Sequence, residues 1–489
     1  MRLNAHGSRF LIPLILLAAL SSESLAQTRA GALQRAAPKA AEVERRLRAD
    51  LEFLASDALR GRGSASHDEW VSATYIAAQL RAAGVEPAGD AGGYLERVVL
   101  RQPALAAPPT LAVGEGPKAK HWTHGKEMLV WSLQRVVTAG PLQKIDASSG
   151  AAPQPRRGAI VFLTPRTGAG APSTALQAYE LIGRGAAAVL LPEWPSIRAR
   201  WETLGGQLPE ISQQVAGLEQ VQVPADLTAV ALSSDAAKQI NAMSDGTPLR
   251  LEADVKEEKT AVTWNVLGRL PGRDPALREQ VVLLSAHHDH VGVGKAVNGD
   301  SIYNGADDDA SGVAAVLELA RQLAAGPRPR RTVIFALFGS EESGGYGALY
   351  FRERPPVPLD KLDKMVANLE FEMIGRPDPK VPPKTLWLTG YERSNLGLRL
   401  AAQGAHLVAD PHPDQNFFRR SDNYVLAKRG VVAHTISSYG LHKDYHQPSD
   451  DVSHIDFAHM TEAIQSLVAP VRWLVNSAFT PQWNQGMGP

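Results

Sequence analysis

Five short segments in the second half of the chain carry His, Asp and Glu at positions that could hold metal ions. They are 286–290 (AHHDH), 305–312 (GADDDASG), 339–342 (GSEE), 370–372 (EFE) and 444–446 (DYH). Two zinc ions about 3.5–4 Å apart need a carboxylate that can bridge them, with neutral His and further carboxylates on each side. A carboxylate that is not a ligand must then move the proton of the attacking water to the leaving group. The segments therefore predict hydrolysis at a two-metal centre.

Each segment taken alone has an ordinary structural explanation. Three consecutive Asp suit a helix N-terminus, adjacent Glu residues suit a solvated turn, and a single His suits a loop. The metal interpretation is favoured because all five segments occur in order, each beside the end of an apolar run. The chain has no Cys, so thiol nucleophiles and Cys-based zinc sites are excluded.

Alternating strands and helices must position these segments. Apolar runs at 281–285, 332–338, 365–374 and 431–436 predict buried strands. Helical periodicity follows at 313–323 and 456–475. This order predicts an α/β domain with a mostly parallel sheet, whose functional groups gather beyond the carboxyl ends of the strands.

The first half of the chain divides into parts of different character. Residues 40–86 have helical periodicity around a Gly/Ser-rich loop at 59–69, and the Pro-rich stretch 102–111 is typical of a linker. Residues 113–257 contain short strand-like runs but no compact group of His and carboxylates, which predicts a separate, non-catalytic domain. We therefore assign 27–112 to the N-terminal part of the catalytic domain and 258–489 to its main part.

The N-terminus has the layout of a secretory signal peptide over residues 1–26. Arg2 and Arg9 precede the apolar run 10–20, and Ser24-Leu25-Ala26 offers a small-x-small cleavage site. The apolar run is too short for the roughly 20 residues of a spanning helix, and no later stretch reaches that length. We expect an exported protein, periplasmic or extracellular, without a membrane span after signal removal.

Overall composition excludes some partners. The 489 residues suggest two or three domains. Lys plus Arg and Asp plus Glu are both 51, so the whole molecule has no basic field for nucleic acid or anionic lipid. Nothing in the sequence predicts an oligomeric state.

The motifs resemble a known family. The strings SAHHDHVG, YNGADDDASGVAAVLELAR, FALFGSEESGGYGA, NLEFEMIGR and DYHQPSDD are similar to those of the co-catalytic dizinc exopeptidases of clan MH. This resemblance implies a three-layer α/β fold, a mixed but mostly parallel sheet with helices on both faces, and two Zn²⁺ per chain. The inserted segment resembles a protease-associated domain, through RRGAIVFLTPR and RGAAAVLLPEW, which implies a smaller β-rich domain.

Carried over position by position, the resemblance implies five metal ligands. One zinc is bound by His287 and Glu372, the other by Glu342 and His446, and Asp308 bridges both. Asp308 is the matching position because it lies four residues before Gly312. The family most often has Asp where this chain has Glu372. The family also often has a cis peptide bond after the bridging carboxylate, which predicts one between Asp308 and Asp309.

The same resemblance implies three catalytic or positioning residues. Glu341 would be the general base that activates a zinc-bridging water, and Asp289 would orient the His287 imidazole. Tyr445 would donate to the tetrahedral intermediate. The other histidines, among them His288, His290, His434, His442 and His454, are interpreted as structural or solvated.

Two glutamates compete for the ligand position in the run 366–374. Strand side chains alternate, so Glu370 and Glu372 share one face and parity cannot separate them. Glu372 lies nearer the carboxyl edge, where the site is expected. We predict that Glu372 binds metal and that Glu370 is buried against a hydrogen-bonding partner.

Three functions remain open at the level of sequence. The leading one is an aminopeptidase that removes N-terminal residues from peptides, since an Asp- and Glu-rich cleft suits a free α-amine. A carboxypeptidase or dipeptidase on the same scaffold would need a cation for the substrate carboxylate, which Arg419, Arg420 or Lys443 could supply. A catalytically inactive binding module would be expected to lack zinc ligands, and none is missing.

Overall fold

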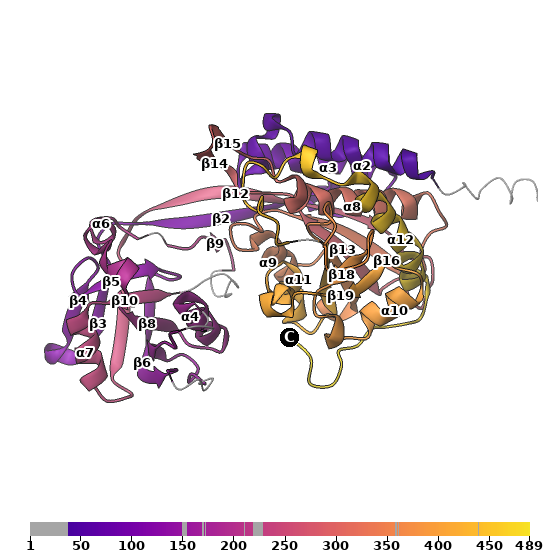
Figure 1. The fold of residues 1–489 in the computed structure, drawn as a ribbon. Coiled ribbons are helices and arrows are strands. Elements are labelled where there is room, and N and C mark those ends of the chain that lie inside the picture. The colour runs from indigo at the N-terminus through magenta and orange to yellow at the C-terminus, as the bar shows by residue number, and fades with distance from the viewer. Residues whose placement is uncertain are drawn as a thin grey trace, which may run out of the picture.

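The computed structural model describes residues 38–489 apart from 149–153, 169–170, 172, 210, 219–227, 357–358, 360 and 439. The predicted signal peptide, 1–26, lies outside the described residues. Among the described helices, none combines the length and the apolar character that crossing a membrane requires. Two large sheets organise the molecule, one in the part that carries the predicted site and a smaller one in the inserted segment (Figure 1). A third sheet has only two strands, β14 (Gly292–Val297) and β15 (Asp300–Tyr303).

The larger sheet is mixed, with a parallel centre. Neighbouring strands β16, β13, β17 and β20 are parallel, and their apolar residues are almost fully buried, as expected for strands covered on both faces. Antiparallel strands extend the sheet beyond β16. In spatial order the strands are β19 (Leu407–Ala409), β18 (Leu386–Leu388), β20 (Ala433–Ser437), β17 (Met365–Phe371), β13 (Val281–His287), β16 (Thr332–Phe338), β12 (Val255–Leu270), β2 (Leu95–Leu105) and β9 (Gln214–Val215), with β1 (Glu86–Pro87) paired to β12.

Helices cover both faces of this sheet and make the predicted three layers. The larger core lies under α2 (Ala40–Leu54), α3 (His67–Ala82), α8 (Gly312–Ala324), α10 (Leu396–Ala402) and α12 (Phe457–Asn476). The core on the opposite face includes side chains of α9 (Tyr346–Glu353) and α11 (Asn423–Ala427). The α/β class predicted from the alternation of elements is thus confirmed. The two helices α2 and α3 flank the loop 55–66, which returns to the site described below.

The inserted segment builds its own sheet around its own core. The strand order is β4 (Lys120–Thr123), β3 (Thr110–Val113), β11 (Pro248–Glu252), β6 (Val137–Asp146), β7 (Ile160–Thr164), β8 (Ala188–Pro192), β10 (Ala229–Leu232) and β5 (Met128–Ser132). Its helices are α4 (Thr174–Gly183), α5 (Pro195–Arg198), α6 (Trp201–Gly205) and α7 (Ser234–Ala242). The sequence predicted this domain at 113–257, and the strands of its sheet run from Thr110 to Glu252.

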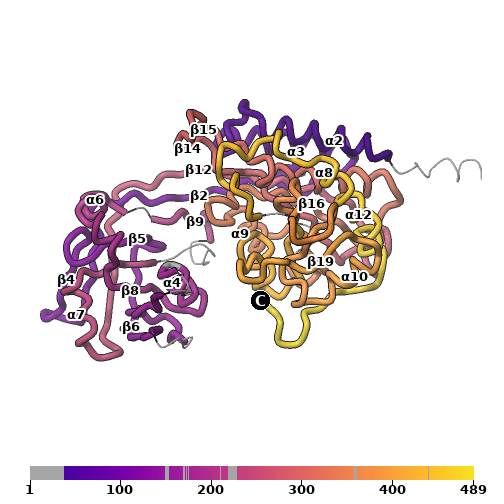
Figure 2. Tube along the Cα trace, in the orientation of Figure 1, coloured from indigo at the N-terminus to yellow at the C-terminus, as the bar shows by residue number. Residues whose placement is uncertain are grey.

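Two long strands of the larger sheet lead to and from the inserted part. β2 and β12 are antiparallel partners along their length, and Figure 2 shows the two traces running side by side between the two parts. The prediction of a linker at 102–111 was therefore wrong for 102–105, which belong to β2, and for 110–111, which begin β3 (Thr110–Val113). Pro103 is tolerated there because, among the described residues, β9 pairs with Leu100 and Arg101 but does not reach Pro103, which has a neighbouring strand on the β12 side alone.

Candidate metal centre

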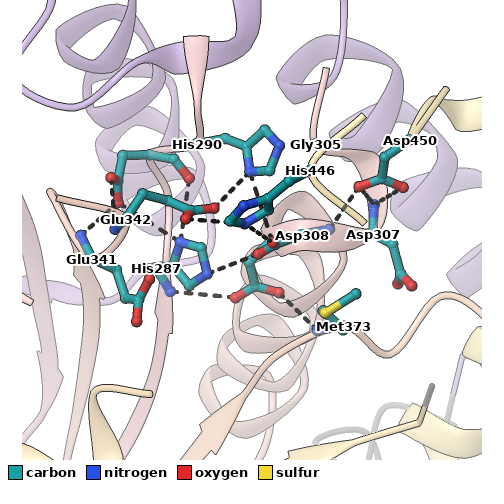
Figure 3. A network of polar contacts seen from close by, with 12 residues as sticks. His287, His290, Gly305, Asp307, Asp308, Glu341, Glu342, Met373, His446 and Asp450 are labelled. Atoms are coloured by element: carbon teal, nitrogen blue, oxygen red, sulfur yellow. Dashed lines mark hydrogen bonds and ion pairs between the residues drawn. The ribbon is translucent and has the colours of Figure 1, made fainter. Parts of the chain in front are cut away.

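The predicted site residues meet at the carboxyl edge of the parallel strands. His287 is the last residue of β13, Glu342 follows β16, Glu372 follows β17 and His446 lies in the loop after β20. Asp308 comes from the turn Ala306–Ser311, which leads into α8. Figure 3 shows His287, Glu342 and His446 turned toward Asp308. Residues far apart in sequence are thus brought together by the topology of one sheet.

One group of candidate ligands consists of His287, Asp308 and Glu372. His287 Nε2 lies 3.1 Å from Asp308 Oδ1, and the His287 side chain is fully buried. On the other side of the ring, Nδ1 faces the backbone oxygen of Asp289 at 3.2 Å. That contact fixes the ring so that Nε2 points into the site.

A second group shares Asp308 with the first and contains Glu342, His446 and also His290. His446 Nε2 lies 3.2 Å from Asp308 Oδ2 and 3.1 Å from Glu342 Oε2. His290 Nδ1 lies 2.9 Å from Glu342 Oε1. His290, interpreted from the sequence as structural or solvated, is 1% exposed and therefore not solvated, and its ring faces two carboxylates.

The side chains of the two groups are arranged as metal ligands rather than as hydrogen-bond partners of one another. Three buried nitrogens approach the carboxylates: His287 Nε2, His290 Nδ1 and His446 Nε2. None of them has a hydrogen-bond partner within the part of the chain that the structure describes. Burial also raises the pKa of Glu372 to about 7, which a nearby cation would offset. Buried nitrogen and oxygen atoms that converge without hydrogen bonds are the donors that zinc takes.

Asp289 holds the loop that carries the two adjacent glutamates. Its carboxylate accepts hydrogen bonds from the backbone N–H of Glu341 at 3.0 Å, from that of Glu342 at 3.3 Å, and from Ser64 Oγ at 2.5 Å. Its Oδ1 lies 3.7 Å from His287 Nδ1. Asp289 therefore ties the β13 end to the β16 end, in addition to facing the His287 ring.

The neighbours of Asp308 hold backbone rather than face the site. Asp307 accepts from the N–H of Gly375 at 2.7 Å, and Asp309 accepts from the N–H of Gly312 at 2.9 Å. The Asp308–Asp309 peptide bond is cis, as predicted. Among the three consecutive Asp, only Asp308 belongs to the ligand groups of the described residues.

A buried scaffold behind the site was not found by sequence reasoning. Arg62 is 1% exposed and donates to the backbone oxygens of His288 at 3.0 Å, Asn304 at 2.7 Å and Gly305 at 2.9 Å. Asp450 accepts from the N–H of Asp308 at 3.1 Å. These contacts fix the loops on both sides of the bridging carboxylate, and the only sequence signal for them was proximity to the motifs.

Three residues at the site, one of them the candidate ligand His446, have a left-handed backbone, which is uncommon for residues other than Gly. Ser340 has φ 54°, Met373 φ 53° and His446 φ 52°. The N–H of Ser340 donates to Glu69 Oε1 at 3.1 Å, and that of Met373 to Asp309 Oδ1 at 3.2 Å. Such conformations cluster at functional sites, where surrounding contacts hold them.

The remaining predicted residues surround the two groups. Glu341 belongs to neither ligand group among the described residues, and burial with neighbouring carboxylates such as Asp422 raises its pKa well above the usual range. The Tyr445 ring stacks on that of His446, with centroids 3.9 Å apart. Glu370 accepts hydrogen bonds from the Asn423 N–H and, at 3.4 Å, from Thr435 Oγ1. Glu370 is therefore buried against hydrogen-bonding partners, as predicted, whereas Glu372 belongs to a ligand group.

A cavity of about 40 Å³ adjoins the site at Glu372. Its walls include the aromatic side chains of Trp387, Phe417 and Tyr445, together with Arg420. The Arg420 guanidinium lies 5.0 Å from the Phe417 ring centroid. A small, partly apolar space beside the ligands is suited to hold part of a substrate.

Comparison with known families gives the same assignment. Residues 265–471 match peptidase family M28, and this range contains both ligand groups. The match covers less than half of the chain.

Relatives of the M28 region are known from several organisms. A probable lipoprotein aminopeptidase, LpqL of Mycobacterium tuberculosis, is 29% identical over 196 residues, which are 40% of this chain and 33% of LpqL. A probable zinc metalloprotease of Pyricularia oryzae is 39% identical over 90 residues, 18% of this chain and 17% of that protein. These matches span a third or less of each relative. Among solved structures, an aminopeptidase from Aneurinibacillus sp. strain AM-1 aligns with 91% of this chain and 96% of its own, at 19% identity and TM-score 0.48.

Proposed function

We propose that the chain is an exported zinc aminopeptidase that removes N-terminal residues from peptides. The observation that carries this proposal is the arrangement around Asp308: two ligand groups share this carboxylate, and Glu341 lies beside them without belonging to either. The proposed ligands are His287 and Glu372 on one side and Glu342 and His446 on the other. The name of the mycobacterial relative agrees with this activity.

The residues of the chain divide the work of hydrolysis. Two bound zinc ions would polarise the substrate carbonyl and lower the pKa of water. Glu341 takes the proton from the attacking water and delivers it to the leaving amine, a task that suits a carboxyl group with a raised pKa. The Asp289 carboxylate keeps Glu341 in place by accepting a hydrogen bond from the Glu341 backbone N–H. Tyr445, beside His446, would donate a hydrogen bond to the developing oxyanion.

Carboxyl groups near the cavity support recognition of an α-ammonium group. Glu372 lines the cavity, and the carboxyl groups of Glu341 and Asp422 both act on it electrostatically. Burial raises the pKa of Asp422 to about 8, so this group is poorly ionised until a cation approaches. A substrate ammonium would be such a cation.

One observation favours a second candidate, a carboxypeptidase or dipeptidase. Arg420 lines the cavity beside Glu372 and could hold a substrate carboxylate. Arg419 instead lies against Tyr424, with 5.7 Å between guanidinium and ring centroid, and it does not line that cavity.

Export and the role of the inserted domain belong to the same proposal. The signal-peptide layout of 1–26 supports export, and the balanced charge supports peptide substrates over nucleic acid. The inserted sheet is proposed to be a protease-associated domain without catalytic residues.

A panel of blocked dipeptides tests the proposal. We expect hydrolysis of substrates with a free N-terminus and a blocked C-terminus, no hydrolysis when the blocks are exchanged, and loss of activity with a chelator. The variant Arg420→Ala is the matched test of the second candidate, with Arg419→Ala as control. Selective loss of activity on free carboxylates in Arg420→Ala would favour the carboxypeptidase.

A further inference from the structure

His290 makes the two ligand groups unequal. The first group offers three residues, His287, Asp308 and Glu372, whereas the second offers four, because His290 joins Asp308, Glu342 and His446. Three protein ligands leave a coordination position for water or substrate, and four close a tetrahedral site. The difference lies in a single side chain.

The spacing of the second group suits one tetrahedral ion. With metal–ligand bonds of about 2.0–2.2 Å, neighbouring ligand atoms lie roughly 3.3–3.6 Å apart. His290 Nδ1 is 2.9 Å from Glu342 Oε1 and 3.9 Å from Asp308 Oδ2, and His446 Nε2 is 3.1 and 3.2 Å from the same two carboxylates. Three of these distances are slightly shorter than this tetrahedral edge and one is slightly longer, so small shifts of the side chains would admit one ion.

The surroundings of His290 hold its ring in this position. Its backbone N–H donates to the Arg62 oxygen at 3.1 Å. Gly305, with φ +59°, lies against the ring: a Cβ at that position would be 2.5 Å from the His290 ring carbon. Neither ring nitrogen has a hydrogen-bond partner among the described residues, although the ring is 1% exposed. A buried imidazole without such a partner is unusual in a folded protein, and a metal ion would supply one.

We infer that His290 is a fourth protein ligand of the metal shared by Glu342 and His446. This inference rests on the two-zinc centre of the proposed function. On this inference, the four-residue site binds the first zinc ion tightly, and the site of His287 and Glu372 binds the second, which exchanges more readily. The open position of the centre then lies on the side of Glu372, which is also the side of the cavity.

Zinc titration of the metal-free chain, with a competing chromophoric chelator, tests the inference. Wild type should bind two zinc ions in two steps. His290→Phe, which keeps a ring without nitrogens, should weaken the tighter step by at least ~10²-fold and leave a second step, because losing even an outer partner of a ligand costs 10–100-fold. His446→Phe should weaken the same step. The control is His288→Phe, since His288 Nε2 contacts the Trp264 oxygen at 2.7 Å and belongs to neither ligand group.

Cobalt spectra supply a readout that does not depend on activity. With one equivalent of Co²⁺, wild type should show the intense visible absorption of a tetrahedral site, and His290→Phe should lose it. If His290→Phe fails to fold, as judged by circular dichroism of the metal-free protein, His290→Asn replaces it in the titration. Unchanged affinities and spectrum in the His290 variant would overturn the inference while leaving the two-zinc centre intact. Failure of wild type to bind two metals would instead overturn the centre itself.

Discussion

The two large sheets of this molecule both contain four neighbouring parallel strands, but they differ in the residues at the carboxyl ends of those strands. In the larger sheet, β16, β13, β17 and β20 are parallel neighbours, and in the smaller one β6, β7, β8 and β10 are. Beyond the larger set lie both ligand groups, whereas the described residues beyond the smaller set form none. Glu193, after β8, instead pairs with Arg198 at 2.9 Å near the surface. Similar arrangements of parallel strands thus differ in whether they carry a candidate metal site, because the site depends on the residues that follow the strands.

Replacing Glu341 with Gln, at the carboxyl edge of the larger sheet, should cause the largest loss of activity. The amide cannot carry the proton, so turnover should fall by at least ~10²-fold while both zinc ions remain bound. Kinetics and metal analysis of the same preparation measure this. The matched variant Glu342→Gln should lose metal affinity as well as activity. Zinc loss in Glu341→Gln with zinc retained in Glu342→Gln would reverse the two roles.

Glu372 and Glu370 provide a pair within one strand and its end. Glu372→Ala should remove or weaken the zinc shared with His287, since Glu372 belongs to that ligand group. Glu370→Ala should mainly lower thermal stability, because it leaves the buried Asn423 N–H without its acceptor. Zinc content and melting temperature separate the two effects. A structure with zinc on Glu370 would refute the assignment.

Asp289 tests how much the loop scaffold contributes. Asp289→Ala frees the N–H groups of Glu341 and Glu342, so we expect turnover or zinc affinity to fall by about 10–100-fold, the usual cost of losing an outer partner of a metal site. Ser64→Ala, which removes one contact of the same carboxylate, is the milder control. Activity of Asp289→Ala within twofold of wild type would contradict a positioning role.

The smallest effect on activity is expected in the inserted sheet. Leu190 in β8 and Leu284 in β13 are both buried core residues. Each change to Ala should lower stability by about 2–5 kcal/mol, but only Leu284→Ala should also weaken zinc binding, because β13 carries His287. Denaturant unfolding and zinc titration of both variants measure this. Equal loss of zinc in Leu190→Ala would show that the inserted sheet supports the site.

Sequence reasoning located the site more fully than its surroundings. The strand runs alone predicted that the five segments gather at the carboxyl edge, whereas the choice of Asp308 and Glu342 as ligands came from the family resemblance. Side-chain alternation could not separate Glu372 from Glu370, and only position along the strand favoured Glu372. The orientation of His290 depends on how its loop packs against Arg62 and Gly305, and no periodicity in the sequence encodes that contact. Sequence reasoning missed the strand at 102–105 because Pro is typical of linkers. Pro103 fits in β2 because the described residues pair with it from one side.

The central claim is that Asp308 bridges two metal ions at the carboxyl edge of the larger sheet. The most direct test is an anomalous difference map at the zinc edge from crystals of the zinc-loaded protein. The account predicts two peaks about 3.5–4 Å apart on either side of Asp308, one bonded to His287 and Glu372 and the other to Glu342 and His446. A single peak, or none in contact with Asp308, would contradict it.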